Sequence, residues 1–212
     1  MEGPLCGGHV GFKEKELNQP DKMLPVLVQE TIKEMIPFEQ KYGRKIPVIA
    51  GGGIYGGKDM YEIMRLGASA VKIGTRFVTT VECDAAEEFK QNYIDAGPED
   101  ITIIHSPVGL PGRVISNDFV KEIQAGMQKP VNCPWKCLKT CDYNKVQFCI
   151  AEALFNAAQG EFEHGFSFAG SNAWKAEEIT TVREAIEQIK AEYFHQEMEF
   201  ISKIEEQTIY PR

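Results

Sequence analysis

The sequence predicts an α/β fold in which neighbouring parallel strands are joined by a helix. Two short apolar runs with β-branched residues, at 46–50 and 71–73, have the pattern of buried parallel strands, and each is followed by glycine. Between them, residues 59–66 have the pattern of a helix that Gly67 closes. Because parallel strands need such a crossover, this region is predicted to form a βαβ unit.

The chain before this unit begins with a glycine-rich loop and continues into a helix. Residues 1–12 carry no strand ahead of the glycines, although such a loop usually follows one, so we expect that an upstream strand is missing. Residues 24–42 have an amphipathic pattern, with Pro25 suited to the first turn and Gly43 at the stop. Pro37 is expected to bend or interrupt this helix.

Beyond residue 84 the pattern becomes mainly helical. We expect a strand at 101–104, a turn at 107–112, a short strand at 166–169, and helices at 85–95, 117–126, 145–158 and 181–206. The predicted division is an α/β part at 1–84 and a helical extension at 85–212 that packs on it.

Composition favours a protein that acts on small molecules. The 212 residues are 43% hydrophobic and 25% charged, which is typical of a globular chain. A net charge of −8, with both signs interspersed, argues against a broad basic surface for nucleic acid or anionic lipid. Neither a membrane span nor a signal peptide is evident, which predicts a cytoplasmic location and reduced cysteines.

Two glycine-bearing loops are predicted to lie side by side at the carboxyl ends of the strands. Parallel α/β folds commonly bind phosphate groups at such ends, through backbone N–H groups and helix N-termini. Glycine lets the backbone approach phosphate oxygens, and a threonine adds a hydroxyl donor. The candidates are therefore Gly52, Gly53, Gly74 and Thr75, and the alternative is that these glycines form turns that bind no ligand.

The order of motifs resembles that of nitronate monooxygenases and flavin-dependent enoyl-acyl-carrier-protein reductases. Residues 3–12 (GPLCGGHVGF) are similar to the family's glycine–histidine loop, and residues 46–54 (IPVIAGGGI) are similar to its flavin-phosphate loop. Similar segments follow at 67–77, 106–113 and 168–173. The sequence departs from the family pattern at Cys6 and Gly51, where alanine is common, and at Gly56, where aspartate is frequent.

The resemblance implies that the chain is the C-terminal part of an FMN-binding (β/α)8 barrel. In the family the glycine–histidine loop follows roughly the sixth strand, so residues 1–84 would supply only the last strands of a partial barrel. The four phosphate candidates would then hold FMN, together with Gly8 and, as weaker candidates near the flavin, Ser171 and Asn172.

His9 is the candidate catalytic residue. A histidine in a glycine loop is more often a surface or hydrogen-bonding group, but an imidazole suits proton transfer near neutral pH. The resemblance implies that His9 takes the α-proton of a nitroalkane, or orients and protonates an enoyl substrate. His105, His164 and His195 are expected to be structural or solvated.

Four cysteines, Cys133, Cys137, Cys141 and Cys149, lie within 17 residues. They could bind zinc or an iron–sulfur cluster, but the spacing fits the usual paired zinc motif only loosely. Reduced, partly buried thiols are the favoured interpretation. If the segment were helical, the first three would share one face.

Three functions remain open from the sequence. The first is FMN-dependent oxidation of nitronates or nitroalkanes by dioxygen, and the second is reduction of an enoyl thioester by FMN and a reduced nicotinamide. The third is an inactive fragment, or a cysteine-rich metal-binding or interaction protein. A half-barrel exposes open strand edges, so we expect self-association or a complementing N-terminal half.

Overall fold

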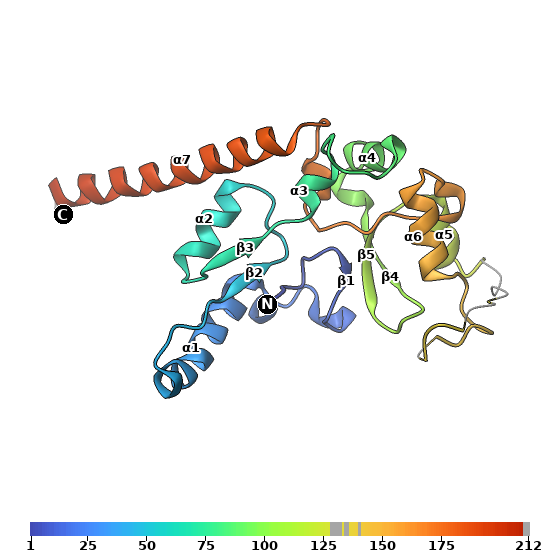
Figure 1. Ribbon diagram of the computed structural model, residues 1–212, viewed down its shortest axis with the longest axis horizontal. Coiled ribbons are helices and arrows are strands. Elements are labelled where there is room, and N and C mark those ends of the chain that lie inside the picture. Colours follow the sequence, from blue (N-terminus) through green and yellow to red (C-terminus); the bar gives the residue numbers. More distant parts are fainter. Residues whose placement is uncertain (128–132, 134–135, 140, 210–212) are drawn as a thin grey trace.

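The computed structural model has a mixed α/β fold and describes residues 1–127, 133, 136–139 and 141–209. A two-stranded parallel sheet joins β2 (Ile49–Gly51) and β3 (Ala70–Lys72) through α2 (Gly57–Arg65). A three-stranded antiparallel sheet has the order β1 (Gly8–His9), β5 (Pro111–Ile115), β4 (Ile101–His105). Figure 1 shows the two sheets at the centre of an elongated molecule.

The predicted βαβ unit is confirmed, with different bounds. α2 begins at Gly57, because the Asp59 carboxylate accepts the backbone N–H groups of Tyr55 and Gly56 at 2.8 and 3.1 Å and so fixes the first turn. The strand predicted at 46–50 covers only Ile49–Gly51, which is as long as its partner β3. Its expected burial on both faces is also wrong, since Ile49 is 51% exposed.

The first long helix, α1 (Leu24–Tyr42), matches its prediction at both ends. Pro25 lies in the first turn, and Gly43 ends the helix in the left-handed conformation at φ 62°. The helical assignment continues through Pro37, so the expected interruption does not occur. Leu24 and Val28 pack with Ala50, Ile54 and Ile63 into a core beneath β2 and β3.

Among the described residues after residue 84, four α-helices and the β4–β5 hairpin follow. The helices are α4 (Glu87–Ile94), α5 (Asp118–Gln124), α6 (Ile150–Ala158) and α7 (Val182–Ile209), and a one-turn α3 (Thr75–Val78) precedes them. The helix predicted at 145–158 begins only at Ile150, because Cys149 is an extended N-cap. The predicted strand 166–169 forms one bridge, between Phe168 and Val114 of β5.

A second core lies between the hairpin and α5 and α6. It is built from Ile104, Val114, Phe119, Val120, Ile123, Phe148, Ile150, Ala153 and Phe166. Phe166 is fully buried and contacts three other aromatic rings. This core therefore holds the β4–β5 hairpin against α5 and α6. Whether residue 84 separates two domains stays a prediction, although β1 from the first part pairs with β5 from the second.

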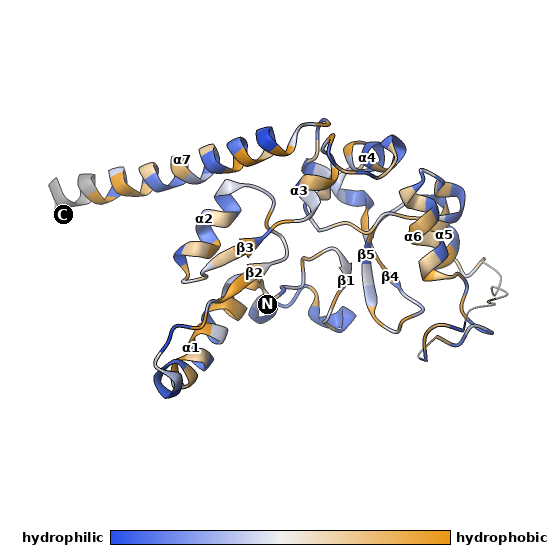
Figure 2. Cartoon of the chain, in the orientation of Figure 1, coloured by the Kyte–Doolittle hydropathy of each residue, from blue (hydrophilic) through white to orange (hydrophobic). Residues whose placement is uncertain are grey.

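α7 is the longest helix and packs against α2 (Figure 1). Thr181 and Glu184 cap its start reciprocally: the Thr181 N–H donates to the Glu184 carboxylate, and the Glu184 N–H donates to the Thr181 hydroxyl. Polar and apolar residues alternate along it (Figure 2). In the part of the chain that the structure describes, no helix is long and apolar enough to cross a bilayer.

Candidate cofactor site

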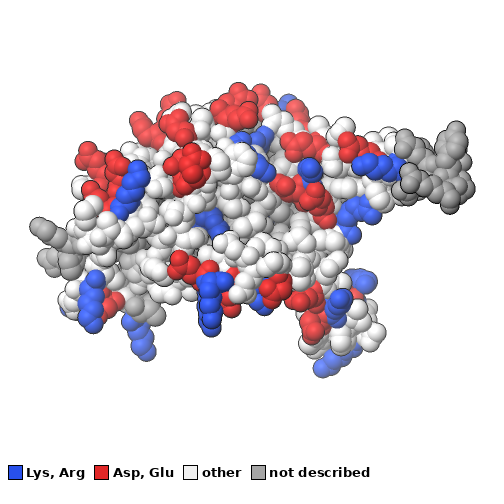
Figure 3. Space-filling view, turned by 180° about the vertical axis from the view of Figure 1, so that it is seen from behind, with Lys and Arg blue, Asp and Glu red and all other residues white. Residues whose placement is uncertain are grey.

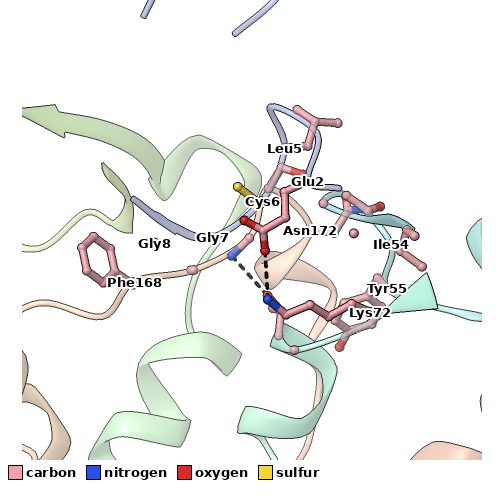
Figure 4. Close-up of a pocket in the computed structure, with 18 of the residues that line it drawn as sticks. Glu2, Leu5, Cys6, Gly7, Gly8, Ile54, Tyr55, Lys72, Phe168 and Asn172 are labelled. Carbon is pink, nitrogen blue, oxygen red and sulfur yellow. Dashed lines mark hydrogen bonds and ion pairs between the residues drawn. The ribbon is translucent and has the colours of Figure 1, made fainter. Parts of the chain in front are cut away.

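One cavity of about 320 Å³ gathers loops from five parts of the chain. Its walls come from residues 2–8, 51–55, 72–78, Tyr93 and 168–172. Every residue predicted to bind the cofactor lines this cavity: Gly8, Gly52, Gly53, Gly74, Thr75, Ser171 and Asn172. Figure 4 shows side chains from the first loop and from residues 168–172 converging on the same space.

The loop after β2 presents unpaired backbone donors to the cavity. Gly52 and Gly53 adopt φ angles of 101° and 80°, which favour glycine. A Cβ on Gly52 would lie 2.9 Å from the Gly3 carbonyl oxygen, so a side chain would displace the first loop. Within the described residues, the N–H groups of Gly52, Gly53 and Gly74 have no protein acceptor.

Gly74 differs from the other two glycines in its conformation. Its φ of −116° is open to any residue, and a Cβ there would meet nothing within 4 Å. The backbone therefore does not demand glycine at this position. Since Gly74 lines the cavity, its missing side chain leaves the space open for a ligand.

Two hydrogen bonds tie the C-terminal wall to the glycine loops. The Asn172 amide donates to the Gly53 carbonyl oxygen at 2.6 Å, and the Thr75 hydroxyl oxygen accepts the Gly170 N–H at 3.2 Å. The Ser171 hydroxyl is buried and has no partner among the described residues. Asn172 thus holds the loop in place, while Ser171 offers an unused hydroxyl.

Arg113 of β5 anchors the first loop, residues 2–8, by hydrogen bonds. Its guanidinium donates to the carbonyl oxygens of Pro4 and Cys6 at 2.7 and 2.6 Å, and the residue is only 6% exposed. Burial lowers the pKa of Arg113. This role of Arg113 was not predicted from sequence, where the available signal was an arginine among the glycine and apolar residues of a strand.

Charge at the cavity comes from a surface ion pair. Lys72 contacts Glu2 at 2.9 Å, and the two side chains point toward one another in Figure 4. The hydrogen bond with Glu2 raises the pKa of Lys72, which keeps the ammonium charged. Burial raises the pKa of the neighbouring Cys6 thiol, which stays protonated. Neither Glu2 nor Lys72 was predicted from sequence.

His9 lies on β1 at the edge of the cavity rather than in its wall. Its Nε2 is 2.7 Å from the Ser106 hydroxyl oxygen, and its ring packs edge-on against Phe168 at a centroid distance of 4.9 Å. Partial burial lowers the pKa of His9, which favours neutral imidazole at neutral pH. Phe168 lines the cavity, so His9 adjoins it through one ring.

The four clustered cysteines line a separate cavity of about 210 Å³. The described part of residues 133–149 has no helix, so the condition for a shared helical face of the first three cysteines is not met there. Burial, and then the charges of Cys133, Cys137 and Cys149, raise the pKa of Cys141. No three His, Cys, Asp or Glu side chains among the described residues are already gathered to hold a metal ion.

One family model and several relatives match this chain. The family model for nitronate monooxygenase matches residues 1–192. A probable nitronate monooxygenase of Staphylococcus aureus strain JH9 is 30% identical over 169 residues, which are 78% of this chain and 42% of that protein. A (3aS,4S,5R,7aS)-5-hydroxy-7a-methyl-1-oxo-octahydro-1H-indene-4-carboxyl-CoA dehydrogenase of Rhodococcus jostii is 35% identical over 79 residues, which are 37% of this chain and 22% of that protein.

Solved structures extend the likeness to the fold. FabK from Thermotoga maritima superposes with a TM-score of 0.71 at 28% identity, over 95% of this chain and 56% of that chain. Nitroalkane oxidase from Streptomyces ansochromogenes superposes with a TM-score of 0.64 at 20% identity, over 94% and 52%. The chain thus spans about half the length of these structures, and less than half of the two relatives described above. With its model matched over residues 1–192, the chain belongs to the nitronate monooxygenase family, whose members are flavin-dependent oxidoreductases.

Proposed function

We propose that this chain supplies the phosphate-binding side of an FMN site in an enzyme that oxidises nitronates or nitroalkanes with dioxygen. One observation carries the proposal: seven residues chosen from sequence motifs line a single cavity, and His9 adjoins it. The naming of the Staphylococcus relative supports the same reaction.

The residues of the cavity fit the FMN phosphate. The N–H groups of Gly52, Gly53 and Gly74 have no acceptor in the described protein, and a phosphate accepts such donors well. The Thr75 hydroxyl oxygen already accepts from Gly170, so its proton is available to a phosphate oxygen. Gly8 and the unpaired Ser171 hydroxyl would face the rest of the cofactor, and Asn172 would brace the loop.

His9 would act as the base. Bound FMN would supply the electron acceptor for the substrate and the electron donor for dioxygen. If Nε2 carries the proton and donates it to Ser106, Nδ1 carries the lone pair that removes the α-proton of a nitroalkane. Nδ1 has no partner within the described residues. A nitronate already lacks this proton and would not need the base.

The first test is a released-flavin assay with a visible spectrum of the purified chain. We expect about one FMN per chain, and turnover of a nitroalkane measured as oxygen consumption. His9→Gln should retain flavin and lose turnover of the neutral nitroalkane more than turnover of the nitronate. If wild type and His9→Gln turned over the neutral nitroalkane equally fast, His9 would not be the base.

Enoyl reduction is the alternative within the same site. The likeness to FabK at 28% identity is consistent with it, and the same cavity would then hold FMN while a reduced nicotinamide supplies electrons. The small-molecule substrate would be an enoyl thioester. Nicotinamide oxidation that depends on an enoyl thioester, without nitroalkane-dependent oxygen consumption, would favour this reaction.

A partial (β/α)8 barrel is the fold that we propose for this part of the enzyme. β2, α2 and β3 would be among its last units, and the remaining strands would come from a complementing N-terminal half. Without that half, the open strand edges would favour self-association. The 51% exposure of Ile49 on β2 supports such a neighbour, because an apolar strand residue of a complete barrel would be covered. A location in the cytoplasm goes with this proposal. A colourless chain that takes up no FMN, even with the complementing half, would favour an inactive fragment.

A further inference from the structure

The cysteine-lined cavity lies apart from the cofactor cavity. The first is lined by residues between Cys133 and Ala151, and the second by none of these. Four of the six cysteines in the sequence line the first cavity, which also has the apolar walls Leu138, Val146 and Ile150. A set of four thiols in an apolar pocket has the donors that soft metals prefer and little other polar chemistry.

The described residues of the connection between α5 and α6 form neither helix nor strand. Their backbone hydrogen bonds are local turns, such as Lys145 N–H to the Asp142 carbonyl at 2.8 Å. A bound ligand would therefore add order to the residues around the four cysteines.

We propose that Cys133, Cys137, Cys141 and Cys149 bind a soft metal centre, either one zinc ion or an iron–sulfur cluster, that organises the described residues of this connection. Both centres take four cysteine thiolates, and the spacing does not separate them. Each thiol that becomes a ligand releases its proton to solvent. The sulfur atoms line the walls of the cavity without forming a metal shell, so binding would draw them inward.

Two features of the surroundings suit a thiolate centre. Cys149 is the N-cap of the nine-residue α6, where the helix dipole favours a negative sulfur. Lys136 also lines the cavity, and its ammonium lies 5.2 Å from the centre of the Tyr143 ring. A four-thiolate centre carries net negative charge, which this cation would partly offset.

The centre would also brace a wall near His9. Val146 lines both the cysteine cavity and a third cavity of about 460 Å³. That third cavity is lined by Ser106, whose hydroxyl contacts His9. A metal that fixes the connection would therefore fix the surface beside the hydrogen-bond partner of the proposed base.

The test measures metal on the full chain purified anaerobically with reductant and without chelator. We expect about one zinc per chain, or about four irons with about four sulfides, by elemental and sulfide analysis. Zinc without sulfide identifies the mononuclear site, and iron with sulfide identifies the cluster. Cys137→Ser and Cys141→Ser should lose most of the metal. Cys83→Ser is the matched control, because Cys83 is a partly buried cysteine outside the cavity, and it should keep the metal.

A second measurement guards against variants that fail to fold. The wild-type apo chain is titrated with Co²⁺, whose thiolate charge-transfer bands report sulfur ligation, and each cysteine is then alkylated and identified by mass spectrometry. Protection of the four cysteines by the metal, with Cys83 still reactive, supports the site. The proposal is overturned by a chain that takes up no metal under reductant, by equal protection of Cys83, or by metal content unchanged in both variants. None of these outcomes depends on FMN binding.

Discussion

The cofactor cavity draws its walls from residues 2–172, whereas the cysteine cavity is lined by one stretch, residues 133–151. In the first, Arg113, Asn172 and Thr75 join distant loops by hydrogen bonds between protein groups. In the second, the described backbone makes only local turns. One site is therefore organised by the fold, while a ligand would add order to the other.

Substitution of the proposed base His9, at the edge of the cofactor cavity, should change activity most. His9→Gln should lower turnover of a neutral nitroalkane by about 10²–10⁴-fold, because the general base is lost, while bound flavin stays unchanged. Turnover and released flavin are measured on the same preparation. His105→Gln is the matched control, since His105 is exposed and pairs with Glu14, and its activity should match wild type.

Next comes the stability of the organised site. Arg113→Leu should lower the free energy of unfolding by about 2–4 kcal/mol, because two buried carbonyl oxygens lose their donor. Urea denaturation measures this change. Arg183→Leu, on the exposed face of α7, should change it by less than about 0.5 kcal/mol. If Arg113→Leu lowered the free energy of unfolding no more than Arg183→Leu does, the fold would not depend on this anchor.

A smaller effect is expected on cofactor affinity alone. Gly74→Val should weaken FMN binding by about 10–100-fold, because the side chain enters the open space where the phosphate would lie. The fold should survive, since φ at Gly74 suits any residue. Gly11→Val is the matched control: a Cβ at Gly11 also meets nothing within 4 Å, but Gly11 does not line the cavity. If Gly74→Val bound FMN as tightly as wild type, the phosphate would not lie beside Gly74.

The smallest effect is on pH dependence. Burial lowers the pKa of His9, so activity should persist below the ordinary histidine pKa of about 6.5 and fall only as the pH drops through the lowered value. As the pH falls, His9 is protonated in the unfolded chain before it is protonated in the folded chain. The free energy of unfolding should therefore decrease between the ordinary histidine pKa and the lowered pKa of His9. The pH dependence of kcat/KM on a neutral nitroalkane shows where activity falls on the acidic side. A fall that begins above about pH 6.5 would contradict the assignment of His9 as the base.

The sequence predicted what is local in the cofactor site and missed what is distant. The glycine loops were identified because residues such as Gly52 and Gly53 are needed for their own backbone conformation. The anchor from Arg113 to Cys6 spans 107 residues, and no pattern along the chain encodes that partner. The same applies to the contact between His9 and Ser106, which are 97 residues apart.

The predicted bounds and burial of elements were wrong where tertiary packing decides them. An apolar run predicted β2 to be buried on both faces, but the described sheet has only two strands and leaves Ile49 exposed. The cysteine segment shared a helical spacing, yet the helix starts only after Cys149. Charge was easier to anticipate. Lys and Arg lie scattered among Asp and Glu on the face seen in Figure 3, in line with the interspersed signs of the sequence.

The anchoring of the first loop by Arg113 has a consequence for biosynthesis. The ribosome adds about 5–20 residues per second, so Cys6 is made about 5–20 s before the strand that holds its carbonyl oxygen, 107 residues later. During that interval the glycine loop lacks its anchor. If the cavity binds FMN as proposed, a nascent chain that stalls before β5 should carry no flavin there.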